Sequence, residues 1–148
     1  MIHLGINVRR LTDEHLLDER TSLLAVLVQL LNKLEDVTLI IPETLTIDNV
    51  DVFLRNKMLS VYLRHSRVCR EITRRNLWTG SEPTMSEEMW QRVPKGYWHT
   101  YSPTASEKMM FIEHTEDLIR LSSGIFHYEK KAITSDQAIS LLYSPIKK

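Results

Sequence analysis

One stretch near the N-terminus, RLTDEHLLDERTSL, combines helix-forming residues with the acidic and histidine side chains used in acid–base chemistry. Thr12 and Asp13 suit the start of a helix, because their side chains can accept hydrogen bonds from free backbone N–H groups. Leucines then recur at helical spacing and predict an apolar face over about 13–34. The polar side of this helix contains His15, Asp18, Glu19, Arg20 and Ser22. This side is either a solvated surface or one half of an active site.

The composition predicts one globular domain in the cytoplasm. The chain has 148 residues, of which 43% are hydrophobic and 26% are charged. No apolar run reaches the length needed to cross a membrane, and the N-terminus has no hydrophobic signal-peptide core. The single cysteine, Cys69, excludes an intramolecular disulfide and suggests a reducing compartment.

Charge is distributed unevenly, although 19 basic and 19 acidic residues give a net charge of zero. Zero net charge argues against binding to nucleic acid over the whole surface. The middle of the chain is basic, and Arg67, Arg70 and Arg74 fall within about 60° of one another on a helix. Arg64 and Arg75 lie on an adjacent strip. Such a stripe can neutralise backbone phosphates, or it can be a solvated face that pairs with the acidic first helix.

Helical periodicity extends over three long segments, about 13–34, 50–76 and 105–121. Shorter helices are expected after Ser86 and Ser135. Residues 1–9 fit a strand or an extended arm, and residues 37–41 (VTLII) resemble a strand that ends at Pro42. We therefore predict an all-α fold, a compact three-helix domain with long ordered loops and at most two short strands. The helical domain spans 1–133, and 134–148 forms a C-terminal tail with a short helix.

Neither a metal nor a cofactor is expected from the sequence. His65 and Cys69 are four residues apart and could reach one metal ion, but the chain has no second ligand pair. Glycine-rich phosphate motifs and the nucleophile-elbow motif are absent. Aromatic residues are concentrated in the late loops, namely Trp78, Trp90, Tyr97, Trp98 and Tyr101. Loop aromatics can stack on extruded bases, but they more often fasten a loop to the core.

Four segments, taken in order, resemble the pyrimidine-dimer DNA glycosylase family, the endonuclease V type known from T-even phages. The segments are LTDEHLLDERTSL, LIIPETLTIDNVDVFLRNKMLSVYLRHS, CREITRRNLWTG, and QRVPKGYWHTYSP with the later GIFHYEKKAI. The resemblance covers residues 1 to about 133. It depends on the order and the nearly gapless spacing of the segments, because no single motif is diagnostic.

The resemblance implies an endonuclease V-like helical fold and a DNA-cleaving chemistry. In this family the free α-amine of the N-terminal residue attacks the sugar C1′, expels the damaged base and forms an imine, and β-elimination then nicks the strand. An α-amino group suits this step because its ordinary pKa is about 8. A carboxylate on the first helix stabilises the developing positive charge on the sugar. In the family, the corresponding aromatic and basic C-terminal segment contacts the damaged strand.

The alignment places substitutions at the family's catalytic positions. Met1 falls at the nucleophile, and the bulky Ile2 predicts that this methionine is retained. Ser22 stands at the position of the catalytic glutamate, and Thr21 and Ala25 stand at the positions of two substrate-binding arginines. His15 and Glu19 match a histidine and a non-catalytic glutamate of the family. The candidate catalytic residues are Met1 through its α-amine, His15, Glu19 and Ser22.

These substitutions predict a member of the family that binds double-stranded DNA, damaged or abasic, with base excision weakened or lost. One alternative is an active glycosylase and abasic-site lyase of altered specificity, with the Met1 amine as nucleophile and Glu19 or Asp18 as a relocated acid. Another alternative is a protein-binding module that reuses the fold and contacts its partner through the Arg64–Arg75 helix. The candidate DNA-contacting residues are Arg64, Arg67, Arg70, Arg74, Arg75, Phe126, His127, Tyr128, Lys130 and Lys131.

Overall fold

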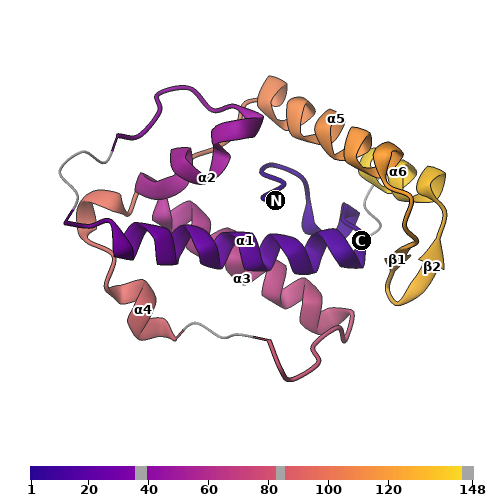
Figure 1. The fold of residues 1–148 in the computed structure, drawn as a ribbon, viewed down its shortest axis with the longest axis horizontal. Coiled ribbons are helices and arrows are strands. Elements are labelled where there is room, and N and C mark those ends of the chain that lie inside the picture. The colour runs from indigo at the N-terminus through magenta and orange to yellow at the C-terminus, as the bar shows by residue number, and fades with distance from the viewer. Residues whose placement is uncertain (36–39, 83–85, 145–148) are drawn as a thin grey trace.

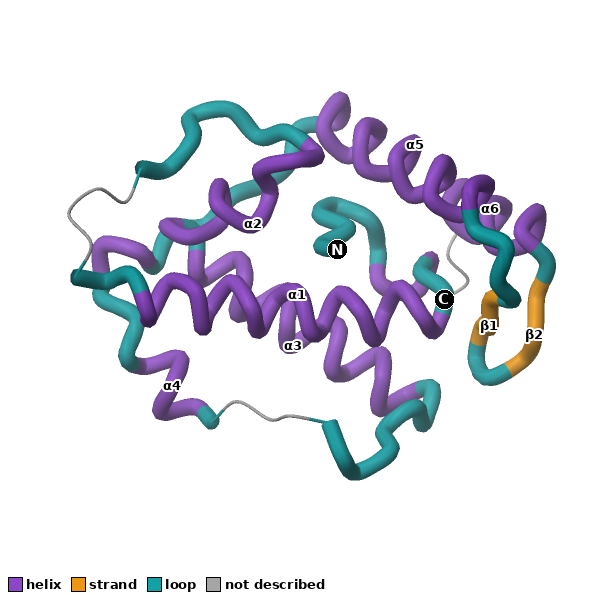
Figure 2. Tube along the Cα trace, viewed as in Figure 1, coloured by secondary structure: helices purple, strands orange, loops and turns teal. Residues whose placement is uncertain are grey.

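A computed structural model describes residues 1–35, 40–82 and 86–144 of the chain. The described part is mostly helical, with one small two-stranded sheet, so the predicted all-α class holds at this level (Figure 2). The elements are α1 (Asp13–Asn32), α2 (Val50–Phe53), α3 (Met58–Arg74), α4 (Glu87–Gln91), α5 (Ala105–Leu121), β1 (Phe126–Tyr128), β2 (Lys131–Ile133) and α6 (Ser135–Tyr143).

Three long helices frame the core, as the periodicity predicted. Figure 1 shows α1 crossing in front of α3, with α5 along another side of the molecule. The N-terminal segment curls between them, and its apolar side chains Ile2, Leu4 and Ile6 are buried in the core. This segment consists of turns and a short 3-10 helix, Val8–Arg10, and is neither the strand nor the extended arm expected from the sequence. The first residues of the chain are therefore held in a fixed position against α1.

The expected helix over 50–76 is two helices, which corrects the sequence prediction. The chain leaves α2 through a 3-10 turn, Leu54–Asn56, and Lys57 has φ −123° and ψ 46°, outside the helical region. The Lys57 ammonium donates to the carbonyl of Phe53 at 3.0 Å, and the Lys57 backbone forms an isolated bridge with Trp98. Apolar spacing continues on both sides of this break, so periodicity alone does not reveal it.

The remaining predicted elements agree with the structure, apart from one that it does not describe. α5 begins and ends at the predicted residues, and Thr104 forms a capping box with Glu107. Ser86 precedes α4, and Thr134 caps α6 in a second capping box. The strand-like segment 37–41 falls largely on residues 36–39, which lie outside the described part.

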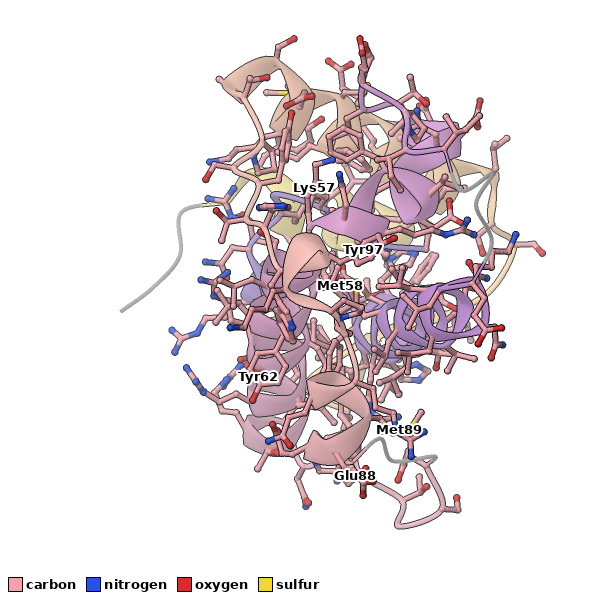
Figure 3. All side chains as sticks on the ribbon, turned by 90° about the vertical axis from the view of Figure 1, so that its left-hand side faces the viewer. Lys57, Met58, Tyr62, Glu88, Met89 and Tyr97 are labelled. Carbon is pink, nitrogen blue, oxygen red and sulfur yellow. The ribbon has the colours of Figure 1, made fainter. Side chains whose placement is uncertain are left out.

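Loop aromatics fasten the segment 86–103 to α3, as their default interpretation predicted. Tyr62 of α3 makes edge-on ring contacts with Trp90 at 5.2 Å and with Trp98 at 6.0 Å, and its hydroxyl donates to Glu87. Figure 3 places Glu88 and Met89 of α4 on one side of Tyr62, and Lys57, Met58 and Tyr97 on the other. These aromatic rings are therefore part of the packing.

The hairpin of β1 and β2 is anchored to the start of α1. Its two-residue turn, Glu129 and Lys130, has positive φ values of 50° and 71°. Both turn residues donate their backbone N–H groups to the carboxylate of Asp13, at 3.0 and 2.8 Å. Thr12, rather than Asp13, caps α1, which leaves Asp13 free to hold the hairpin. None of the described helices combines the length and the apolar composition needed to cross a membrane.

Candidate active site

The Met1 nitrogen lies against the polar face of α1. It donates a hydrogen bond to the Ser22 hydroxyl oxygen at 2.8 Å and forms an ion pair with the Asp18 carboxylate. Asp18 and Ser22 are four residues apart, so one helical turn brings both side chains to the same side of α1. The structure therefore brings together Met1 and Ser22, which the alignment had assigned to the two central catalytic positions.

A cavity of about 270 Å³ opens beside this amine. Its walls come from the N-terminal segment, α1 and α2, and are formed by Met1, Ile2, Ser22, Ala25, Val26, Gln29, Val50 and Asp51. Pockets for drug-sized ligands are usually about 300–1,000 Å³, so this one has room for part of a ligand, such as a single sugar. Ala25 lines this cavity, and its small side chain leaves space that a longer side chain would fill.

A buried ion pair between Glu19 and Arg64 fixes the segment that positions the amine. The Glu19 side chain is fully buried and accepts bonds from Arg64 and from the backbone N–H of His3 at 2.9 Å. The Arg64 guanidinium also donates to the carbonyls of His3 and Ile6. Burial alone would raise the pKa of Glu19, but the adjacent Arg64 outweighs it and holds that pKa below its usual value.

This network corrects two of the sequence assignments. Glu19 was a candidate relocated acid, but its carboxylate is occupied by Arg64 and by the N-terminal backbone. Arg64 was a candidate phosphate contact, but only 8% of it is exposed. Both residues therefore act as supports for the N-terminal segment, and Asp18 is the carboxylate that reaches the amine.

Two histidines pack next to each other behind the amine. The ring centroids of His3 and His15 are 5.0 Å apart, and His3 is completely buried. The Thr115 hydroxyl donates to the Phe111 carbonyl, so Nδ1 of His3 is the donor in its 2.8 Å bond to Thr115. Burial lowers the pKa of His3 to about 3 and also lowers that of His15. Of the two, His15 is the one on the helix face of Asp18 and Ser22.

The arginine stripe is smaller than the sequence predicted. Arg75 is buried and paired with Asp13 and Glu71, so it is not available to a phosphate. Arg74 forms ion pairs with Glu71 and Glu129, whose hydrogen bonds raise its pKa. Arg67 and Arg70 are exposed, and neither has an ion-pair partner within the ranges that the structure describes.

The hairpin residues also divide into packed and exposed groups. Phe126 is buried, which corrects its assignment as a DNA contact. The His127 ring bonds to Glu14 at 2.5 Å, and the Tyr128 hydroxyl donates to the carbonyl of Arg9. Lys130 and Lys131 remain exposed and can meet an anionic strand.

His65 and Cys69 of α3 are half-buried, and the His65 ring packs against Trp90 with centroids 5.4 Å apart. Nε2 of His65 lies 3.5 Å from Sγ of Cys69, and burial raises the pKa of the Cys69 thiol. In the ranges 1–35, 40–82 and 86–144, no group of three histidine, cysteine or acidic side chains is arranged to hold a metal ion.

From the sequence, Asp18 was only one of two candidates for a relocated acid. In the structure Asp18 and Ser22 are one helical turn apart, and the amine contacts both. The spacing of Asp18 and Ser22 can be read from the sequence and puts them on one side of the helix. The sequence does not reveal that the Met1 nitrogen lies against that side. No protein-family model matches this chain, and comparison with curated proteins and with solved structures gives no match.

Proposed function

We propose that this protein is a DNA-binding relative of the pyrimidine-dimer DNA glycosylases in which base excision is weakened or lost. Its Met1 amine keeps the ability to form an imine with the aldehyde of an abasic site. The observation that supports this proposal is the position of the Met1 nitrogen between Asp18 and Ser22, beside a cavity large enough for a sugar.

Imine formation needs a neutral amine and a group that accepts its proton. Asp18 can accept this proton because its carboxylate contacts the Met1 nitrogen. The nitrogen can then attack the aldehyde carbon of an opened abasic sugar, and the carbinolamine loses water to give the imine. Ser22 donates or accepts a hydrogen bond during these proton transfers but supplies no charge.

Base excision from an intact nucleotide needs more electrostatic stabilisation than imine formation at an abasic site. The departing base leaves a cationic sugar, and a carboxylate against that sugar is a large source of stabilisation. Ser22 occupies the position where the resemblance implies such a carboxylate, and the carboxylate of Glu19 is neutralised by Arg64. This difference supports abasic-site chemistry over glycosylase chemistry.

Borohydride trapping on a duplex with one abasic site tests the proposal. The wild-type protein should form a covalent adduct through Met1, and peptide mass spectrometry should place the adduct on the N-terminal peptide. Intact mass measurement of the natural protein should first establish that Met1 is its free terminus. Absence of any adduct at Met1 would refute the imine chemistry.

Asp18→Asn should slow trapping by about a hundredfold, the lower end of the typical contribution of a proton-transfer group. Asp51→Asn is the matched control, because Asp51 lines the same cavity and makes no bond to the amine. If Asp18→Asn and Asp51→Asn slow trapping equally, the charge of the cavity matters and the contact between Asp18 and the amine does not.

A second candidate is an active glycosylase of altered specificity with Asp18 as its acid. The ion pair between Asp18 and the Met1 nitrogen favours it, because a carboxylate is present next to the nucleophile. Efficient trapping on DNA that contains a damaged base, abolished by Asp18→Asn, would select this candidate over the first.

A further inference from the structure

A second and larger cavity, a groove of about 700 Å³, lies along the N-terminal segment. Its walls are the loop 4–8, one side of α3, the loop 100–103 and the first turns of α5. None of its lining residues lines the cavity beside the Met1 amine. The candidate active site therefore does not account for this groove, which we call the α3–α5 groove.

The α3–α5 groove is cationic. Arg10, Arg64, Arg67 and Lys108 line it, and its lining includes no acidic residue. The charge of Arg64 is balanced by Glu19, but Arg67 and Lys108 are exposed and have no ion-pair partner among the described residues. Arg10 donates one bond to the carbonyl of Leu142, and its Nε is buried without a hydrogen-bond partner. An anion in the groove would pair with the exposed side chains of Arg67 and Lys108.

The groove also has an apolar part and hydroxyl groups. Leu63 is 40% exposed here, and Tyr101, Pro103 and Ile112 lie in the same lining. Thr100 and Ser102 add hydroxyl groups. A ligand that matches this lining has an anionic end and a flat or apolar end.

The wall of the groove is held in place before any ligand arrives. Gly5 has φ +83°, and a Cβ at this position would lie 2.7 Å from Cγ of Lys108, so the loop approaches α5 as closely as only glycine allows. Arg64 fixes the same loop by its bonds to the carbonyls of His3 and Ile6. A preformed wall lowers the entropy cost of binding.

We propose that the α3–α5 groove binds a nucleotide, with the phosphate held by Arg67 and Lys108 and the base against Leu63 and Tyr101. Inorganic phosphate alone would leave the apolar part uncovered, and an uncharged nucleoside would leave the cations unpaired. The nucleotide can be free or can belong to single-stranded DNA. This proposal does not depend on imine formation at Met1, since the two cavities have separate linings.

Titration of the ¹⁵N-labelled full-length protein with dAMP, followed by NMR, tests the proposal at low salt. The signals of Gly5, Arg67 and Thr100 should shift, while deoxyadenosine and inorganic phosphate should each bind about tenfold more weakly. Arg67→Gln and Lys108→Gln should each reduce the dAMP affinity by roughly tenfold, as for the loss of one charged hydrogen bond. Arg70→Gln is the matched control, because Arg70 is exposed on the same helix outside the groove. Arg70→Gln should change the dAMP affinity by less than twofold.

Short thymidine oligonucleotides identify the source of the nucleotide. Binding of dAMP alone supports a free nucleotide, and binding of an oligonucleotide that Arg67→Gln weakens supports a nucleotide within single-stranded DNA. The proposal is overturned if no ligand shifts the groove signals, if deoxyadenosine binds as well as dAMP, or if Arg67→Gln and Arg70→Gln have equal effects. Because these measurements use neither borohydride nor abasic DNA, their failure is distinct from failure of the Met1 chemistry.

Discussion

The Met1 nitrogen donates to the Ser22 hydroxyl oxygen at 2.8 Å, although 21 positions separate the two residues in the sequence. The same nitrogen contacts Asp18, one helical turn earlier, so the amine has a hydroxyl on one side and a carboxylate on the other. A glutamate at position 22 would place a second carboxylate next to the amine, which makes Ser22 the position where excision chemistry can be tested.

Ser22→Glu should increase borohydride trapping on dimer-containing DNA. The wild-type protein should react with that substrate about a hundredfold to a thousandfold more slowly than an enzyme with the carboxylate, the typical cost of losing one electrostatic stabiliser. Thr21→Glu is the control, because Thr21 is exposed and its hydroxyl donates to the Leu17 carbonyl, away from the amine. Efficient trapping on dimer DNA by the wild type would contradict this prediction and would make Asp18 the acid.

Glu19→Gln should destabilise the protein by about 3–5 kcal/mol, because it leaves the Arg64 charge buried without its partner. Urea denaturation followed by circular dichroism measures the change. Replacing Glu19 and Arg64 together by methionine should cost less than the sum of Glu19→Met and Arg64→Met made singly. Arg70→Gln, on the exposed side of the same helix as Arg64, should change stability by no more than about 0.5 kcal/mol. Additive single and double changes would show that the pair is not coupled.

Stability should fall as the pH is lowered from about 6.5, the ordinary pKa of histidine, towards 3, the pKa of His3 in the folded state. In this window the unfolded chain binds a proton at His3 that the folded chain does not, so His3 removes about 1.4 kcal/mol per pH unit. His15, whose pKa is also lowered, adds to the slope at the upper end. His3→Asn keeps a donor towards Thr115. It should reduce the slope of the free energy of unfolding against pH by about 1.4 kcal/mol per pH unit, the contribution of one proton. An unchanged slope in this variant would contradict the prediction.

Duplex DNA binding should depend on Arg67 and Arg70 and much less on Arg74. Each of the two exposed arginines, changed to glutamine, should reduce the slope of log K against log salt by about 0.9 if it contacts one phosphate. Arg74→Gln should have a smaller effect, because Glu71 and Glu129 already neutralise that guanidinium. Fluorescence anisotropy of a labelled duplex over a range of salt concentrations measures the slopes. If neither Arg67→Gln nor Arg70→Gln alters the slope, this side of α3 is only a solvated face.

The sequence by itself determined the elements whose signals are local. α1 was predicted over about 13–34 and observed over Asp13–Asn32, and α5 matches its predicted bounds. Capping residues and apolar spacing within one helix are enough to define such elements, because each signal lies within a few residues of its effect. The same local signals continue past Lys57, which is why the break between α2 and α3 was missed.

The tertiary structure alone decided which charged residues are functional candidates. Arg64 and Arg67 are one helical turn apart on α3, yet Arg64 is buried against Glu19 and Arg67 is exposed in the α3–α5 groove. Asp18 and Glu19 are adjacent in sequence, yet only Asp18 reaches the Met1 nitrogen. The groups around a charged side chain decide whether it supports the fold or is available for chemistry. In this protein those groups come from distant parts of the chain.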